Sequence, residues 1–409
     1  MPLSYKIAKR YLFSKKSTNA INIIAGITIF AMAFGTIAMI VIMSIFNGFE
    51  GLVIDRYNVF YSDVKIEPAK GKYFDLTDEQ INALKAIEGV DHLSTILEED
   101  ALVEYNDEQY VATVKGVDTG YLNIIGLNED YIINGSLMLY DDNTSYAIIG
   151  AGVRNNLRIN VNIPSKIKIN IPRKNARLTS IESAFNFEYI TPIGEFNVQQ
   201  EFDEKYVLVP QSFVRSIRGE GEDFSSVELK LKPNADKNKT IKAIATLLPE
   251  TVVKNRWQQN ATLYTVMRTE KWVVFAILTF VILIVAFSIT GALSMLIVEK
   301  KKDIAVLRAI GASSKTIQQI FLLEGILLSF VGVFIGVFLS VSFCLLQQYV
   351  GIIPMPGASF IVDFYPVRMK IEDFAATLSA IFLISLLASY FPTLRAVQND
   401  NISESMRVE

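Results

Sequence analysis

The residues able to do chemistry are few in this sequence. It contains one histidine, His92, and one cysteine, Cys344. A zinc site built from several histidine and cysteine ligands is therefore excluded, and no intramolecular disulfide can form. A lone histidine in a water-exposed segment is most often structural. Neither residue indicates catalysis or metal binding.

Two glycine-containing stretches carry part of a nucleotide-binding pattern. Residues 311–316, Gly-Ala-Ser-Ser-Lys-Thr, resemble the end of a phosphate-binding loop, but Ala309 and Ser314 stand where that motif requires glycine. Residues 150–152, Gly-Ala-Gly, lack the third glycine of a dinucleotide fingerprint, with Asn155 in its place. We therefore expect a non-catalytic chain that binds no nucleotide, metal or other cofactor itself.

Four long stretches without Asp, Glu, Lys or Arg dominate the rest of the sequence. Each holds an apolar core near the roughly 20 residues that a helix needs to span hydrocarbon. The charge-free stretches are residues 17–49, 272–298, 325–362 and 374–394. We predict a membrane protein whose transmembrane helices cover residues 21–49, 269–298, 317–346 and 372–395.

The basic residues predict the orientation, because Lys and Arg are retained on the cytoplasmic side of a membrane. Residues 1–20 carry five basic residues and no acidic one, and the loop 299–316 is also rich in lysine. Residues 50–268 hold 24 basic and 32 acidic residues, so this large segment is net acidic. We expect both termini, including the tail 396–409, in the cytoplasm. The domain 50–268 and the loop 347–371 then lie on the other side.

Polar and small residues of the predicted spans give weaker signals. Glu324 lies about one turn inside the third span, where we expect a solvated interfacial position or a pairing with Arg308 or Lys315. An ion pathway is not expected. Gly332 and Gly336 form a small-residue face, as Ala31 and Gly35 do in the first span, which indicates helix packing or dimerisation.

The outward domain contains two similar stretches. Residues 63–68 alternate as a half-buried strand does, and a helical pattern with a capping box at Thr77 and Gln80 follows. Residues 227–233 alternate in the same way, followed by a second helical pattern and a strand at residues 251–253. We predict two strand-helix-strand units that pair across the sequence and enclose an insertion.

The insertion, about residues 116–205, is mostly β in pattern. Residues 166–171 alternate without error, and residues 172–188 form a polar segment with basic residues near one end and aromatic residues near the other. This composition suits a protruding hairpin. An ordinary solvated connection is the alternative.

The cytoplasmic stretch 299–311 has the pattern of a short amphipathic helix. Ile304, Leu307 and Ile310 recur at helical spacing, whereas Lys302 and Arg308 are polar. Such a helix can lie on the membrane surface or dock into a groove of a partner. Periodicity does not separate these two interpretations.

Residues 302–313, KDIAVLRAIGAS, closely resemble the cytoplasmic loop of ABC-transporter permeases of the MacB and FtsX superfamily. Further motifs at the membrane borders are similar to the lipoprotein-releasing LolC/LolE branch. These motifs are residues 8–12, 44–50, 270–272 and 390–396. The tail 401–407 is also similar, although it lacks the proline usual in the family. The resemblance runs the length of the chain.

The resemblance implies an α-helical membrane protein with four transmembrane helices plus an α+β periplasmic domain. The porter-like part of that domain is expected at about 50–115 and 206–268, with the β-rich part inserted between. The resemblance further implies residence in the inner membrane and a second permease subunit, in a homodimer or a LolC/LolE heterodimer. A LolD-like ATPase would bind ATP and magnesium, a LolA-like periplasmic carrier would accept the lipoprotein, and no nucleic acid would be involved. It does not decide between a LolC-like, a LolE-like and a hybrid subunit.

Three sets of site residues follow as expectations. The coupling helix that seats in the ATPase would use Lys302, Asp303, Ile304, Val306, Leu307, Arg308, Ile310 and Gly311. A sideways route for the lipid between the first and second spans would be lined by Met39, Met43, Phe46, Phe275, Ile282 and Phe287. A hairpin that hooks the carrier would include Pro172, Arg173, Lys174, Arg177 and Phe185.

Three other functions are weighed against lipoprotein release. A MacB-type exporter of peptides or toxins usually carries a fused ATPase, which this sequence lacks. An FtsX-type protein that signals to a cell-wall hydrolase has a smaller outward domain. A membrane-anchored enzyme would need a catalytic constellation, and the sequence offers none.

Overall fold

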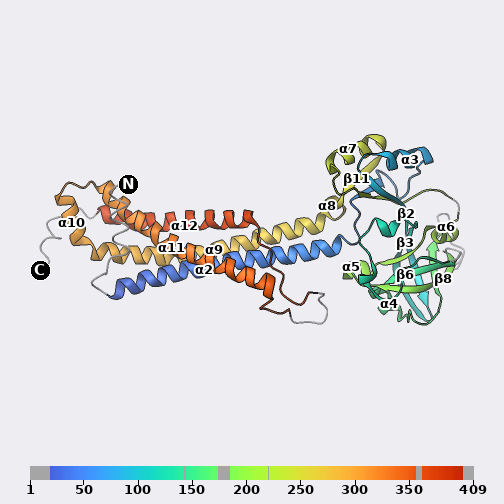
Figure 1. Ribbon diagram of the computed structural model, residues 1–409, viewed down its shortest axis with the longest axis horizontal. Coiled ribbons are helices and arrows are strands. Elements are labelled where there is room, and N and C mark those ends of the chain that lie inside the picture. Colours follow the sequence, from blue (N-terminus) through green and yellow to red (C-terminus); the bar gives the residue numbers. More distant parts are fainter. Residues whose placement is uncertain (1–18, 142–143, 174–184, 220, 356–361, 399–409) are drawn as a thin grey trace. The chain divides into compact units, whose positions relative to one another are not determined.

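A computed structural model describes residues 19–141, 144–173, 185–219, 221–355 and 362–398 (Figure 1). The chain divides into two compact units. One comprises Met1–Leu52 with Thr265–Glu409, and the other comprises Val53–Tyr264. The first unit is helical, and the second is built on a sheet.

Four helices of the described residues are long and apolar enough to cross a membrane, which confirms the four predicted spans. All four helices extend beyond the predicted spans at both ends. The first charged residue marks where a helix leaves the hydrocarbon and not where the helix ends. They are α2 (Asn19–Tyr57), α9 (Ala261–Glu299), α11 (Ser314–Val350) and α12 (Ile371–Gln398). The short α10 (Lys301–Ala309) lies between α9 and α11.

The small-residue faces pack helices together within this one chain. A Cβ atom on Gly332 would lie 2.7 Å from the carbonyl oxygen of Ile29, so α11 approaches the backbone of α2 closely. A Cβ atom on Gly35 would lie 2.7 Å from a methyl carbon of Ile282 on α9. The predicted role of these glycines in helix packing is confirmed.

The two predicted strand-helix-strand units are present in the outward domain, and their strands interleave. The neighbouring strands β11, β1, β10 and β2 pair antiparallel in that order, which is the arrangement of a split βαβ fold. The first unit is β1 (Val64–Pro68), α3 (Asp78–Ala86) and β2 (Val90–Tyr105). The second is β10 (Ser226–Leu231), α7 (Lys237–Leu247) and β11 (Thr251–Asn255), with α8 (Arg256–Gln259) after it. The predicted capping box is made, since Thr77 and Gln80 exchange both hydrogen bonds.

The β-rich part continues the same sheet, in the order β2-β3-β9-β6-β8-β4, and β7 also pairs with β2 and β8. Its strands are β3 (Glu108–Val117), β4 (Ile132–Gly135), β5 (Tyr140–Asp141), β6 (Thr144–Gly150), β7 (Ile167–Pro172), β8 (Phe185–Phe196) and β9 (Tyr206–Pro210). Its helices are η1 (Tyr121–Asn123), η2 (Glu129–Tyr131), α4 (Ala151–Leu157), α5 (Gln200–Asp203) and α6 (Gln211–Arg218).

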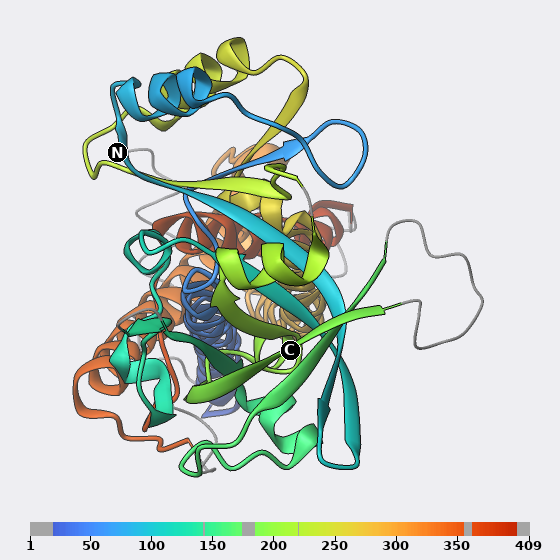
Figure 2. The ribbon, with the colours of Figure 1, turned by 90° about the vertical axis from the view of Figure 1, so that its right-hand side faces the viewer.

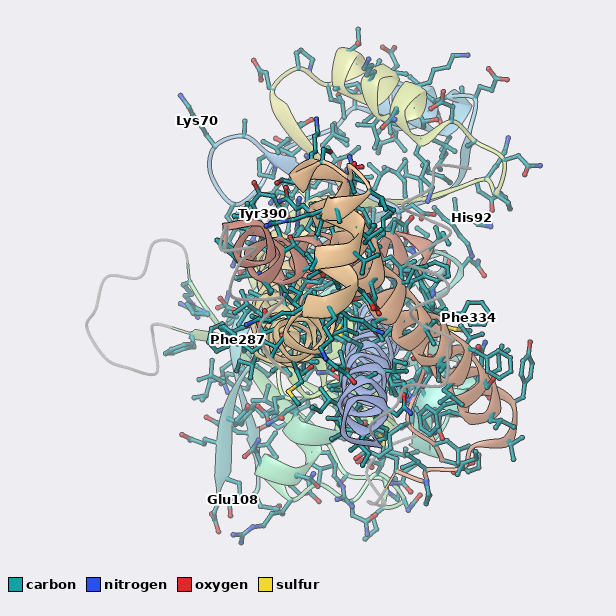
Figure 3. The ribbon with its side chains drawn as sticks, turned by 90° about the vertical axis from the view of Figure 1, so that its left-hand side faces the viewer. Lys70, His92, Glu108, Phe287, Phe334 and Tyr390 are labelled. Atoms are coloured by element: carbon teal, nitrogen blue, oxygen red, sulfur yellow. The ribbon has the colours of Figure 1, made fainter. Side chains whose placement is uncertain are left out.

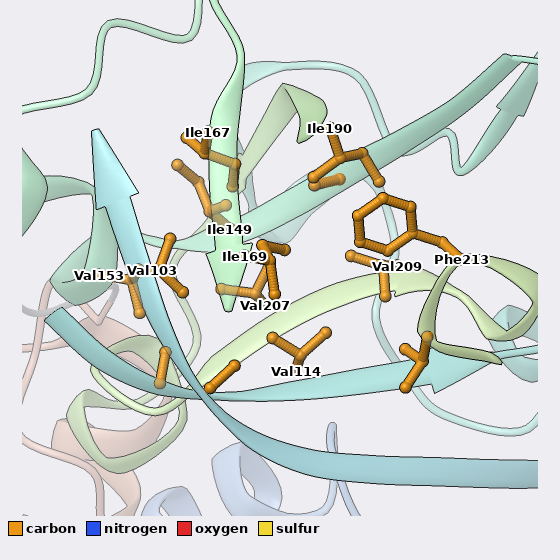
Figure 4. Packing of buried hydrophobic residues seen from close by; sticks show 14 of the residues in the cluster. Val103, Val114, Ile149, Val153, Ile167, Ile169, Ile190, Val207, Val209 and Phe213 are labelled. Atoms are coloured by element: carbon orange, nitrogen blue, oxygen red, sulfur yellow. The ribbon is translucent and has the colours of Figure 1, made fainter. Parts of the chain in front are cut away.

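The border between the two parts differs from the expected one. The second half of β2 pairs with β3, and both contribute to the apolar core shown in Figure 4. Strand β9 and helix α6 belong to that core as well, with Val207, Val209 and Phe213. The β-rich part therefore begins before residue 116 and ends after residue 205. The physical reason is the length of β2, which serves both parts of the sheet (Figure 2).

Candidate functional site

Helix α10 ends in a turn fixed by backbone hydrogen bonds. The N–H of Gly311 donates to the carbonyl of Arg308, and the N–H of Ala312 donates to the carbonyl of Leu307, both at 2.9 Å. This pair of bonds forms a Schellman cap. Gly311 has a φ of +92°, which only glycine adopts without strain. The Ser313 hydroxyl then accepts the N–H of Thr316 and starts α11. The turn therefore holds α10 in a set position beside α11.

The apolar side chains of α10 face two different environments. Ile304 is buried in an apolar cluster with residues of α9 and α11. Val306 and Ile310 are 61% and 76% exposed. The single apolar face expected from Ile304, Leu307 and Ile310 is therefore wrong. Ile304 fastens α10 to its own chain, and Val306 and Ile310 remain free to contact another molecule.

Polar residues surround this exposed pair. Lys301 and Lys302 are exposed, and the Asp303 carboxylate lies 3.0 Å from the ammonium of Lys300. Leu307 and Arg308 are half-buried. An apolar pair framed by basic residues suits a partner groove that is apolar inside and acidic at its rim.

The six residues expected to line a lipid route are not gathered on one surface. Met39, Met43 and Ile282 are buried within the helix bundle. Phe46 and Phe275 are half-buried. Phe287 is 67% exposed and, like Phe334 and Tyr390, points outward from the helices (Figure 3). Within a single chain, the contact between α2 and α9 is closed.

The expected hook segment connects two paired strands. Pro172 at the end of β7 lies opposite Phe185 at the start of β8, and the two strands are antiparallel. The two strands that flank the predicted hairpin thus pair with each other, and residues 174–184 lie outside the described part of the chain. Pro172 and Arg173 are exposed, and Phe185 is half-buried. Lys174 and Arg177 lie outside the described residues.

The base of this hairpin is tied to helix α6. The Arg173 side chain donates to the Asn186 amide oxygen at 2.6 Å. The Asn186 amide group donates to the carbonyl of Ile217 at 2.7 Å. Phe187 and Tyr189, the next outward residues of β8, are 56% and 54% exposed. The hairpin therefore has a fixed root with an aromatic surface beside it.

Glu324 does not occupy the solvated position that we considered. It is completely buried on α11, so the solvated alternative is wrong, whereas a pairing with Arg308 or Lys315 stays a prediction. The neighbouring Gly325 allows a close approach of α12, since a Cβ atom there would lie 2.4 Å from the Ser389 hydroxyl oxygen. Glu324 belongs to the packed interior of the bundle, near the start of α11.

Comparison with known proteins gives matches over almost the whole chain. The MacB-like periplasmic core domain matches residues 25–247, and the FtsX-like permease C-terminal domain matches residues 275–400. The lipoprotein-releasing system transmembrane protein LolC of Neisseria meningitidis is 23% identical, over 98% of this chain and 98% of that protein. LolE of Haemophilus influenzae is 22% identical, over 97% of this chain and 98% of that protein.

The chain belongs to the LolC/LolE family of ABC-transporter permeases. Among solved structures, the periplasmic region of MacB from Actinobacillus actinomycetemcomitans aligns with a TM-score of 0.37 and 14% identity, over 51% of this chain and 95% of that one.

This LolC/LolE-family chain contains a buried ionic cluster that its sequence does not reveal. The Lys115 ammonium on β3 lies 2.7 Å from Glu228 on β10 and 3.2 Å from Glu98 on β2. Lys115 and Glu228 are almost fully buried, and the ring of Tyr121 lies 4.8 Å from the ammonium. The cluster lies where the porter-like and β-rich parts of the sheet meet. Charged residues at alternate positions of a strand are normally predicted to face solvent. The sequence pattern therefore does not indicate this buried cluster.

The charges of this cluster stabilise one another. Burial alone would lower the pKa of the Lys115 ammonium, but Glu228 and Glu98 raise it well above its usual value. Burial would raise the pKa of the Glu98 carboxyl, yet Lys115 and Lys65 lower it to about 2. Both side chains are therefore ionised at neutral pH.

Gly150 and His92, which were considered as possible parts of a chemical site, have a packing role and a surface position. A Cβ atom on Gly150 would lie 2.1 Å from the carbonyl oxygen of Asp203, so a close approach of two backbones requires this glycine. His92 is exposed, with its ring 3.8 Å from the Asp91 carboxylate. Among the described residues, no group of His, Cys, Asp and Glu could hold a metal ion.

Proposed function

We propose that this chain is a transmembrane permease subunit that extracts lipoproteins from the outer leaflet of the inner membrane. It would pass them to a periplasmic carrier for delivery to the outer membrane. The observation that carries this proposal is similarity along the whole length to proteins of lipoprotein-releasing systems, 98% of both chains in the case of LolC. The four apolar helices and the outward domain are the parts that such a subunit needs.

The energetics explain why this work needs an ATPase. Each buried methylene contributes about 0.8 kcal/mol to anchoring, so three acyl chains are held by something on the order of 30 kcal/mol. Spontaneous escape is negligible at that cost. The reaction breaks no covalent bond of the lipoprotein, which fits a chain that needs no catalytic residue. ATP and magnesium would be bound by a separate, LolD-like ATPase subunit.

Helix α10 is where the ATPase would attach. Val306 and Ile310 are the exposed apolar side chains that a partner can cover, and the Gly311 turn holds them in place. Ile304 joins α10 to α9 and α11 through a shared apolar cluster, so a displacement of α10 is passed to both helices. Helix α9 begins at Ala261, directly after the α8 segment of the outward domain. Closure of the ATPase would therefore act on a helix that continues without a break into the outward domain.

The lipid route requires a second permease subunit. Met39 and Ile282 are buried in the contact between α2 and α9, so the chain alone offers no opening there. The exposed apolar side of α9, which carries Phe287, is free to meet the acyl chains. A second copy, or a LolC/LolE partner, would complete the enclosure.

The β7–β8 hairpin and the aromatic residues at its root would contact the carrier. Phe187 and Tyr189 are exposed beside an anchored hairpin base, which suits recognition of a LolA-like protein. This assignment places the outward domain in the periplasm and both termini in the cytoplasm, as the distribution of basic residues predicts.

Reconstitution tests the proposal directly. The chain, its permease partner and the ATPase are placed in proteoliposomes with a labelled lipoprotein and soluble carrier. We expect ATP-dependent transfer of the label to the carrier, and loss of transfer with Ile310→Asp. ATP hydrolysis without any transfer would contradict lipoprotein release. It would then favour a MacB-type exporter or an FtsX-type signalling protein, which can be tested with a soluble peptide or a cell-wall hydrolase in place of the lipoprotein.

A further inference from the structure

Three polar residues from three helices form one hydrogen-bonded cluster to which the proposed function assigns no role. The Lys271 ammonium on α9 lies 2.8 Å from the Asp373 carboxylate on α12. It also donates to the Asn47 amide oxygen on α2 at 2.9 Å. The Asn47 amide group donates to Asp373 and, at 3.2 Å, to the carbonyl of Arg368. We call Asn47, Lys271 and Asp373 the outer clamp.

The clamp lies at the outer border of the hydrocarbon. Lys271 and Asp373 each immediately precede a charge-free stretch, beginning at Trp272 and Phe374. Asn47 is 1% exposed, and the side chains of Lys271 and Asp373 are 22% and 13% exposed. Charges in such a poorly hydrated place attract one another strongly, and removing one partner leaves the other without compensation.

The backbone beside the clamp is shaped to bring the loop before α12 onto α2. A Cβ atom on Gly48 would lie 2.0 Å from the carbonyl oxygen of Pro366, so no other residue fits there without a shift of the loop. The N–H of Arg368 donates to the carbonyl of Ser44 at 2.9 Å. Gly48 and Asn47 both lie in the 44–50 motif, and Lys271 lies in the 270–272 motif. The clamp explains structurally why these residues stand in the two motifs at the membrane border.

The clamp differs in kind from the packing below it. The cluster of Met32, Met39, Ile282 and Leu293 is apolar, and apolar contact is non-directional. Two further hydrogen bonds join these helices, from the Thr28 hydroxyl to the carbonyl of Ser288 at 3.4 Å and from the Thr290 hydroxyl to the carbonyl of Ala388 at 3.0 Å. Hydrogen bonds between an ammonium, a carboxylate and an amide require set distances and angles. Each of those two bonds joins one pair of helices, whereas the clamp is a charged, directional contact that joins α2, α9 and α12 at one point.

We infer that the outer clamp is a positioning site that makes α2, α9 and α12 move as one body where Asn47, Lys271 and Asp373 meet. Force that enters at α10 and travels along α9 would then displace α2 and α12 with it, instead of letting α9 slide alone. The consequence for transport rests on the proposed function. The mechanical claim rests only on the contacts.

The test measures a distance and transport in the same complex. Spin labels are placed at Ile42 on α2 and Ile277 on α9, which are both exposed, in a Cys344→Ala background. The variants are Lys271→Met, Asp373→Asn and the double exchange K271D/D373K. Lys370→Met is the matched control, because Lys370 bonds Glu50 at 2.6 Å beside the clamp but does not reach α9.

We expect a narrow distance distribution in the parent and in K370M, a broad one in K271M and D373N, and a narrowed one in the double exchange. Lipoprotein released per ATP hydrolysed should fall about tenfold in K271M, a size typical of coupling residues. ATPase binding should stay within about twofold.

An unchanged distribution in K271M and D373N would overturn the inference, whatever happens to transport. Absence of lipoprotein release in the parent complex would instead contradict the proposed function. The distance measurement would still show whether the clamp holds α2 and α9 together.

Discussion

The sheet-based outward domain and helix α10 differ in how they place charged and apolar side chains. The domain buries an ammonium, Lys115, between the carboxylates of Glu98 and Glu228. Helix α10 exposes Val306 and Ile310 to solvent. A buried ionic cluster is costly to desolvate and tolerates little displacement of its members. An exposed apolar pair gains free energy only when a partner covers it. The comparison indicates a domain built as one rigid body and a helix built as half of an interface.

The largest expected effect is the loss of the buried cation. Lys115→Met leaves the buried Glu228 carboxylate and the half-buried Glu98 carboxylate without the ammonium between them, and we expect a loss of about 3–5 kcal/mol in the free energy of unfolding. Denaturant unfolding of the full chain in detergent measures this loss. Lys205→Met is the control, since Lys205 is exposed, with its ammonium 5.0 Å from the Tyr206 ring, and should cost less than about 0.5 kcal/mol. Equal losses in the two variants would show that the cluster does not stiffen the domain.

A smaller effect is expected at the exposed pair. Ile310→Asp places a charge where the ATPase would cover an apolar side chain, and binding should weaken by about 2 kcal/mol, or about thirtyfold. Titration of the purified ATPase onto the permease in nanodiscs gives the Kd. Val111→Asp is the matched control, because Val111 is 67% exposed on the outward domain. An unchanged Kd for I310D would mean that α10 is not the docking helix.

The smallest expected effect, about 1–2 kcal/mol, is a pH dependence of the free energy of unfolding that arises from Asp203 in the domain interior. Burial raises the pKa of the Asp203 carboxyl from 3.8 to about 6, although the N–H of Val198 donates to it at 2.9 Å. Between pH 3.8 and about pH 6, the Asp203 carboxyl is mostly protonated in the folded state and mostly ionised in the unfolded chain. The free energy of unfolding therefore falls as the pH rises through this range.

Asp203→Asn keeps the acceptor for Val198 and removes the titration. The stability of D203N relative to the parent should therefore rise by about 1–2 kcal/mol between pH 4 and pH 7. Unfolding midpoints at several pH values measure this difference. A constant difference across the range would refute the raised pKa.

The membrane helices and the porter-like strands could be predicted because their signals are local. Charge-free length marks a span, and the capping box at Thr77 and Gln80 marks a helix start. The border between the two parts of the domain could not be found in this way. Strand β2 belongs to both parts, and only its pairing with β3 and β10 shows where one core ends.

The exposed apolar residues of α10 could be predicted only in part, for a related reason. Ile304 and Ile310 fit one helical pattern, but the neighbours that bury Ile304 come from α9 and from α11. The same holds for Lys115 and for the outer clamp, whose members are distant in sequence and meet only in the fold. Whether a side chain packs inside its own chain or stays exposed for a partner depends on its neighbours in the tertiary structure.

The central claim is that the outward domain and helix α10 lie on opposite sides of the membrane, joined by α9. Single cysteines at positions 111 and 306, in a Cys344→Ala background, test it with a membrane-impermeant maleimide on spheroplasts. We expect Val111→Cys to react in intact spheroplasts and Val306→Cys to react only after lysis. Equal reaction of both positions in intact spheroplasts would place the domain and α10 on one side and contradict the account.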